Sequence, residues 1–236
     1  MVRNVENLDK LVDQLCNDLD SINSSLLAPW QKLDAIRTFI QPCLTFALHA
    51  GEPLKSSHFN YRKKLVEVVR SIMHLPTRAS SCIIFASRKV GGLAFQEPLV
   101  EVDIQTVVQA IKMVSSSDPF VSSIAKAELW SSVRFAARDN PSPSLTRDFL
   151  SGSMRGNFHP NRIRYRTHSL WTRTRSACQR LNISFAVPDN DEPVISTKTS
   201  GPRRAKVGCS FLHHLAQECA SQKLLDLPDQ EKQPEL

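Results

Sequence analysis

An arginine-rich segment is the part of this chain whose residue types best suit chemistry with phosphate groups. Residues 134–180 contain ten Arg, no Lys and two acidic residues, a net charge of +8. The rest of the chain has 20 basic and 21 acidic residues, a net charge of −1. The planar guanidinium group binds phosphates and stacks on bases better than an ammonium group does. Arg162, Arg164 and Arg166 alternate with apolar residues, so an extended backbone would place the three guanidinium groups on one side. This segregation predicts contact with nucleic acid, and a solvated basic loop is the alternative.

Two adjacent carboxylates could hold catalytic metal ions, but the sequence contains no Asp-Asp pair. The nearest pattern is Asp18-Leu19-Asp20, inside a stretch whose apolar residues recur at helical spacing. Such a stripe is typical of an amphipathic helix, with the acidic residues on its solvated face. We therefore predict no catalytic residue in this chain.

The Cys and His residues near the C-terminus offer the one metal-binding pattern worth weighing. His214 and Cys219 have the spacing found at the end of a zinc knuckle, with Cys209 and His213 nearby. A structural zinc site needs four ligands, usually including a close Cys pair, and that pair is missing here. We predict no metal site, and a short amphipathic helix instead. The six cysteines contain no C-x-x-C pair and are interpreted as reduced.

Helical periodicity dominates the pattern of apolar residues, so the fold class expected is mainly α. The expected domains are a helical bundle at 1–140, an Arg-rich helical linker subdomain at 141–182, a disordered linker at 183–208, and a weak helix with a tail at 209–236. The helices expected are at 5–23, 29–49 with a kink at Pro42, 57–73 with Phe59 inward, 100–113, 119–137, 145–150 and 169–181. A short apolar run at 82–86 is compatible with extended structure, and Gly91-Gly92 predicts a tight bend. No apolar run approaches the length of a bilayer span, and the acidic N-terminus is unlike a signal peptide, so a membrane partner and secretion are not expected.

Five short motifs occur in a fixed order along the chain: Leu27-Ala28-Pro29-Trp30-Gln31-Lys32-Leu33, Leu75-Pro76-Thr77-Arg78-Ala79-Ser80, Arg88-Lys89-Val90-Gly91-Gly92-Leu93, Leu150-Ser151-Gly152-Ser153 and Ser169-Leu170-Trp171-Thr172-Arg173-Thr174-Arg175. In this order they resemble the thumb and linker region of reverse transcriptases of non-long-terminal-repeat (LINE-type) retrotransposons, especially those that insert into ribosomal DNA. The resemblance extends to about residue 181. The tail Asp226-Leu227-Pro228-Asp229-Gln230 resembles the segment that precedes the endonuclease in related elements.

The resemblance implies a helical thumb that holds the nascent DNA on its RNA template, followed by a linker that leads to a nuclease. It implies an intracellular, nuclear location and three partners: RNA template, RNA–DNA hybrid or DNA, and the palm and endonuclease domains. Mg²⁺ is expected only in the palm, which would precede Met1, so this chain would need no cofactor and would not polymerise alone. The nucleic-acid-binding residues expected are Lys32, Arg37, Arg62, Lys63, Lys64, Arg78, Arg88, Lys89, Arg162, Arg164, Arg166, Arg173 and Arg175. The alternatives are an inactive nucleic-acid-binding remnant of a truncated element and a helical protein-interaction module.

Overall fold

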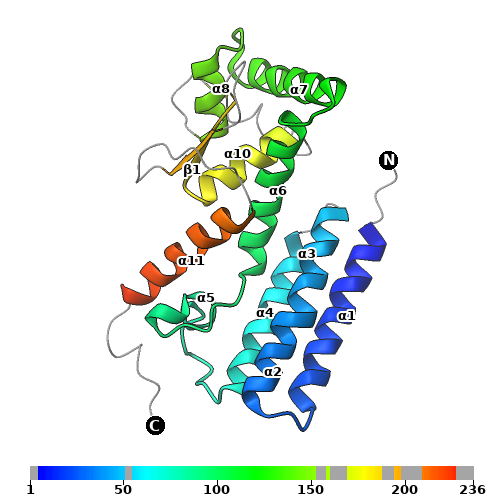
Figure 1. Ribbon diagram of the computed structural model, residues 1–236, viewed down its shortest axis with the longest axis vertical. Helices are drawn as coiled ribbons and strands as arrows, with labels where there is room; N and C mark the ends of the chain where they lie inside the picture. Colours follow the sequence, from blue (N-terminus) through cyan, green and yellow to red (C-terminus); the bar gives the residue numbers. More distant parts are fainter. Residues whose placement is uncertain are drawn as a thin grey trace. The chain divides into compact units, whose positions relative to one another are not determined.

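The computed structural model describes residues 5–50, 55–152, 158–159, 169–187, 194–197 and 209–226, and these are mainly helical (Figure 1). The predicted mainly α fold is confirmed. The chain divides into two compact units, one of residues 1–102 with 213–236 and one of residues 103–212. The boundary expected between residues 140 and 141 therefore lies inside the second unit.

The first unit is built on a bundle of helices that lie side by side (Figure 1). They are α1 (Val5–Ser24), α2 (Pro29–Ala35), the π-helical turn η1 (Ile36–Ile40), α3 (Gln41–Ala50) and α4 (Lys55–Ile72). Apolar residues at helical spacing face inward, among them Leu15, Leu19, Ile36 and Leu65. Burying this stripe away from water is the main force that holds the helices together.

A kink at Pro42 is expected in the helix predicted at 29–49, and the structure shows how the helix accommodates this proline. Pro42 has no N–H to donate to the carbonyl four residues earlier. The backbone widens just before it, where the N–H of Gln41 bonds the carbonyl of Ile36, five residues back. A π-helical turn of this kind lets the helix continue through the proline.

Polar residues are also buried in α4, and sequence periodicity alone misplaces one of its aromatic rings. Phe59, expected inward, has 57% of its surface exposed, whereas Tyr61 is fully buried. His58 is 1% exposed, and neither of its ring nitrogens has a hydrogen-bond partner. An unpaired imidazole in such a site is stable only in its neutral form.

A compact loop connects α4 to α6 (Pro98–Val114). Residues 82–86, interpreted as compatible with extended structure, form the short helix α5 (Cys82–Phe85), which buries Ile84 and Phe85. The 3₁₀ turn η2 (Arg88–Val90) follows, and the predicted bend at Gly91 is confirmed by a φ of +84°. The chain then returns along α5, with the N–H groups of Leu93 and Phe95 bonding the carbonyls of Ile83 and Ile84 at 2.9 and 3.0 Å.

The second unit contains α7 (Pro119–Ala137), α8 (Pro143–Leu150) and α10 (Leu170–Arg180), together with most of α6. Its helix starts follow from the sequence. The carboxylate of Asp118 accepts a hydrogen bond from the N–H of Phe120 at 2.9 Å, and the hydroxyl of Ser142 accepts one from the N–H of Leu145 at 3.2 Å. Trp171 and Phe149 are the largest side chains of its core, and both are at most 1% exposed.

Two short strands lie within the segment 183–208, which was expected to be a disordered linker. β1 (Ile183–Ala186) pairs antiparallel with β2 (Val194–Thr197), with Ile183 opposite Thr197 and Ala186 opposite Val194. Both segments are rich in β-branched or apolar residues, which favour strands. β1 packs against α8 and α10. The last helix, α11 (Cys209–Leu225), lies in the predicted 209–236 segment. Among the described helices, none is long and apolar enough to cross a bilayer.

Candidate nucleic-acid interface

Four of the predicted nucleic-acid-binding residues are exposed cations in the first unit. Lys63 lies on α4, Arg78 follows α4, and Arg88 and Lys89 lie on η2. Within the described residues, these four side chains make no ion pair or hydrogen bond. They are therefore free to contact phosphates.

The η2 loop holds Arg88 and Lys89 outward by backbone contacts on both sides. The hydroxyl of Ser87 accepts a hydrogen bond from the N–H of Lys89 at 3.3 Å. The N–H of Ser87 donates to the hydroxyl of Ser221 on α11 at 3.0 Å. At Gly92, an added Cβ would collide with the backbone carbonyl of Ala86, so only glycine allows this close approach.

Arg37 lies behind this loop and is held by the protein itself. Its guanidinium group donates to Asp34 at 3.2 Å and to the carbonyl of Leu93, and it lies 4.5 Å from the ring centre of Phe95. Burial, followed by the positive charge of Arg88, lowers the pKa of Arg37. Arg37 therefore stabilises the loop and adds positive potential beside Arg88, and it is not a free phosphate ligand.

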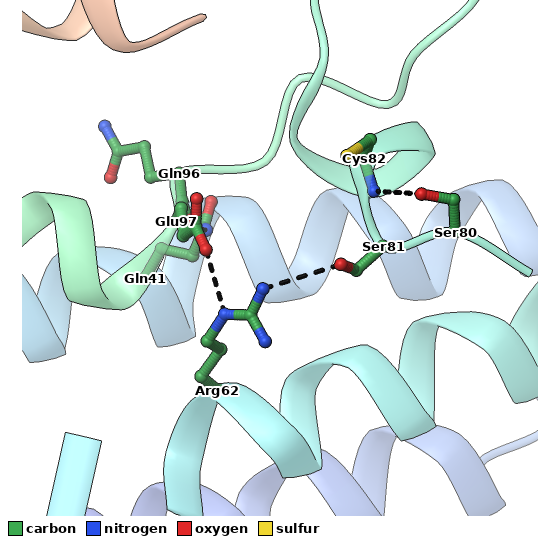
Figure 2. A network of polar contacts seen from close by, with 7 residues as sticks. All are labelled: Gln41, Arg62, Ser80, Ser81, Cys82, Gln96 and Glu97. Atoms are coloured by element: carbon green, nitrogen blue, oxygen red, sulfur yellow. Dashed lines mark hydrogen bonds and ion pairs between the residues drawn. The ribbon is translucent and has the colours of Figure 1, made fainter. Parts of the chain in front are cut away.

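Arg62 connects α4 to both ends of the same loop (Figure 2). Its Nε donates to Oε1 of Glu97 at 2.9 Å, and its Nη2 donates to Oγ of Ser81 at 3.5 Å. The guanidinium group also lies 5.4 Å from the ring centre of Phe85. These three contacts occupy the side chain, so Arg62 has a structural role.

The remaining lysines of the predicted set in this unit also have internal partners. Nζ of Lys32 donates to the carbonyl of Asn23 at 2.7 Å. Nζ of Lys64 pairs with Asp20 at 2.7 Å, and this hydrogen bond raises the lysine pKa. Asp20, interpreted from the sequence as part of a solvated face, is 55% exposed in its side chain, in agreement with that interpretation.

Arg175 is the clearest correction among the predicted site residues, because it is buried. It is 4% exposed, and its Nη1 donates to the carbonyls of Phe149 at 2.5 Å and Asp148 at 3.5 Å. Its guanidinium carbon lies 5.1 and 5.0 Å from the ring centres of Phe149 and Phe158. Burial lowers its pKa to about 10, so it remains charged at neutral pH. A cation at the last carbonyls of α8 is favourable, since those groups have no partner within the helix. Arg175 therefore closes α8 and does not reach a phosphate.

The other arginines of the predicted block fall into two groups. Arg173 is half-buried on α10. Arg162, Arg164 and Arg166, predicted to form a row of guanidinium groups, lie outside the described residues. Their contribution to binding stays a prediction.

The His residues considered for zinc binding have carboxylate partners. His213 Nε2 lies 2.5 Å from Oε2 of Glu101, and His214 Nδ1 lies 3.4 Å from Oε1 of Glu218. Across the described part of the chain, no three His, Cys, Asp or Glu side chains gather as a metal site would require.

Sequence reasoning missed one face of α7 that carries an exposed aromatic ring, an exposed arginine and a half-buried lysine. Lys126, Trp130 and Arg134 recur at intervals of four residues, which places them on one side of the helix. The four-residue spacing of these three side chains is visible in the sequence. The helical periodicity of 119–137 predicts a helix, but it does not show which side of that helix stays uncovered.

No family model, curated protein or solved structure matches this chain. Its function must therefore be inferred from its own residues.

Proposed function

We propose that this chain is the thumb and linker part of a reverse transcriptase of the non-long-terminal-repeat class, and that it holds RNA template and nascent DNA through phosphate contacts. The support for the family is the collinear order of the five motifs. The observation that carries the binding function is the distribution of charge between the two units. Residues 103–212 contain 16 basic and 8 acidic residues, whereas the rest of the chain contains 14 and 15. A unit with so large an excess of positive charge attracts a polyanion.

In this proposal the binding is electrostatic and not catalytic. Lys63, Arg78, Arg88 and Lys89 have no internal partner among the described residues, so they need not give up an existing contact when a phosphate arrives. A polyanion would also relieve the repulsion between Arg37 and Arg88. The sequence contains no Asp-Asp pair of the kind that holds the two Mg²⁺ ions of a polymerase.

The test is a binding titration of the 236-residue chain with a labelled RNA–DNA hybrid, single-stranded RNA and polyglutamate at several salt concentrations. We expect tighter binding to the nucleic acids, with an affinity that falls steeply as salt increases. Incubation with a primed RNA template, Mg²⁺ and labelled dNTPs should give no incorporation above a heat-treated control. Equal affinity for polyglutamate would reject nucleic-acid binding, and template-dependent incorporation would reject the non-catalytic role.

A helical protein-interaction module is the second candidate, and one surface favours it. Phe39 and Phe46 lie seven residues apart, on η1 and α3, and have 67% and 76% of their surface exposed. Exposed aromatic residues are enriched at protein interfaces. In this case Phe39→Ser together with Phe46→Ser would leave nucleic-acid affinity unchanged and abolish binding to the protein partner.

A further inference from the structure

A pocket of about 330 Å³ lies between α7 and the start of α8, entirely within the second unit. Its lining includes Lys126 and Trp130 from α7, Pro141 before α8, Pro143 and Thr146 from α8, and Val187 after β1. Thr146 is 5% exposed, and its hydroxyl has no hydrogen-bond partner among the described residues. The pocket therefore combines apolar walls with a few polar groups, as ligand sites commonly do.

The side of α7 that forms this pocket continues as a row of cations around an indole ring. Trp130 is 46% exposed, with Lys126 one turn before it and the exposed Arg134 one turn after it. Neither cation has an ion-pair partner within the described part of the chain. No acidic side chain lines the pocket. An aromatic ring between two unpaired cations complements a ligand that has a flat face and a negative charge on each side.

We propose that this pocket binds one unpaired base of a single-stranded RNA or DNA, with Trp130 stacked on the base and Lys126 and Arg134 on the neighbouring phosphates. The proposal rests on the proposed nucleic-acid binding and specifies its substrate. An indole stacks on any base, whereas a base inside a duplex has both faces covered by its neighbours. The unpartnered hydroxyl of Thr146 offers a hydrogen bond to a base edge or a phosphate.

A proline-rich peptide is the competing occupant, because such peptides dock in aromatic-lined grooves. The charges argue against it. A polyproline segment has no negative charge to pair with Lys126 and Arg134, and their ammonium and guanidinium groups would lose hydration without compensation. The positive excess of residues 103–212 also favours a polyanion.

The test compares the full chain with Trp130→Ala, Trp130→Phe and the double variant Lys126→Ala/Arg134→Ala. Binding to oligo-uridine, oligo-thymidine, a blunt duplex of equal charge and deca-proline is measured by fluorescence anisotropy. We expect Trp130→Ala to weaken binding to both single strands about tenfold, with an unchanged salt slope and little effect on the duplex. Trp130→Phe should retain most of the affinity. The double variant should reduce the slope of log K against log salt by about 1.4.

Two variants serve as matched controls. Trp30→Ala removes an exposed indole from the first unit, where Trp30 is 65% exposed, and Lys112→Ala removes an exposed cation of the second unit outside the pocket. We expect Trp30→Ala to leave the binding curve unchanged and Lys112→Ala to change the salt slope by less than half as much as the double variant does. Circular dichroism confirms that each variant is folded.

The outcomes separate this proposal from the broader one. If the parent binds nucleic acid but Trp130→Ala binds single strands equally well, the pocket assignment is wrong and the proposed function stands. Equal losses on the duplex and on single strands would exclude stacking on an unpaired base. If Trp130→Ala abolished binding of deca-proline and left oligonucleotide binding unchanged, the pocket would be a peptide site. A parent that binds no nucleic acid would reject both proposals.

Discussion

At the level of single residues, Arg175 carries a positive charge inside the second unit. Replacing it with Ala would remove one donor each from the carbonyls of Asp148 and Phe149, which also accept hydrogen bonds from Ser151 and Gly152. It would also remove the cation from two aromatic rings. We expect Arg175→Ala to lower the free energy of unfolding by about 3 kcal/mol, the magnitude typical of a broken buried charged contact. Urea denaturation measures this, with the exposed Arg147→Ala on α8 as the control, expected within about 0.5 kcal/mol of the parent. Equal stabilities of the two variants would contradict the structural role of Arg175.

His58 makes the stability of the first unit depend on pH. Burial lowers its pKa from 6.5 to about 4, with Asp9 as a weaker opposing influence. Since the folded protein binds this proton less readily than the unfolded chain, the stability is complete above pH 6.5 and declines as the pH falls from 6.5 to 4. The full loss is about 3 kcal/mol, since one pKa unit corresponds to about 1.4 kcal/mol.

Denaturation curves from pH 8 to pH 4 test this dependence. His58→Leu should flatten the decline between pH 6.5 and 4, because it removes the group that titrates. His214→Gln is the control, since His214 is 67% exposed in its side chain and should leave the decline in place. A pH profile of His58→Leu that matches the parent would show that other groups cause the loss.

Among the helices and loops, the segment 80–97 depends most on a single small residue. Gly92→Ala would place a Cβ against the carbonyl of Ala86, so the loop that carries Arg88 and Lys89 must shift. We expect a loss of about 2 kcal/mol in stability and weaker nucleic-acid binding, because overpacking of this kind typically costs about 1–3 kcal/mol. Gly91→Ala is the comparison. It has open space around the added Cβ but a φ of +84°, and should cost about 1 kcal/mol. The reverse order of the two losses in thermal or urea denaturation would argue against the close approach at Gly92.

Helices with a clear apolar stripe and a capping residue could be predicted from the sequence. The helix at 119–137 starts after Asp118 and ends at Ala137 as expected, because the cap and the spacing agree. The elements at Cys82–Phe85 and Ile183–Ala186 could not be predicted, because both are four residues long. Such short runs carry no usable periodicity, and their conformation is decided by the contacts they make with the rest of the fold.

For the whole molecule, the net positive charge lies in the second unit, although the first unit also has exposed basic side chains. The first unit offers Lys63, Arg78, Arg88 and Lys89 but contains one more acidic than basic residue. We expect the triple variant Arg162→Ala/Arg164→Ala/Arg166→Ala to reduce nucleic-acid affinity and the salt slope more than the quadruple Ala variant of those four residues does. The triple variant should reduce the salt slope by about 2 on a single strand if each arginine contacts one phosphate. Anisotropy titrations at four salt concentrations decide the order, and a larger effect of the quadruple variant would place the main contact surface on the first unit.

The candidate site could be predicted from the sequence only in part, for a reason that applies to the whole chain. Residue type gives the charge of Arg37, Arg62 and Arg175, but their availability depends on partners far away in the sequence, such as Leu93 and Glu97. The face formed by Lys126 and Trp130 presents the opposite case. The four-residue spacing of these side chains can be seen in the sequence. The pocket beside them exists only because α8 and Val187 pack against α7.

The buried guanidinium group also predicts how this chain can diverge. Lys63, Arg78, Arg88 and Lys89 are exposed, and the proposed phosphate contact requires only a positive charge, so exchange between lysine and arginine should be nearly neutral there. At position 175 the exchange is not neutral, because an ammonium group cannot reproduce a planar donor that lies against two phenyl rings and bonds two carbonyls. Under selection for folding alone, the exposed positions should drift between the two basic residues and then lose their charge. Position 175 should retain arginine even where the four exposed positions have lost their charge.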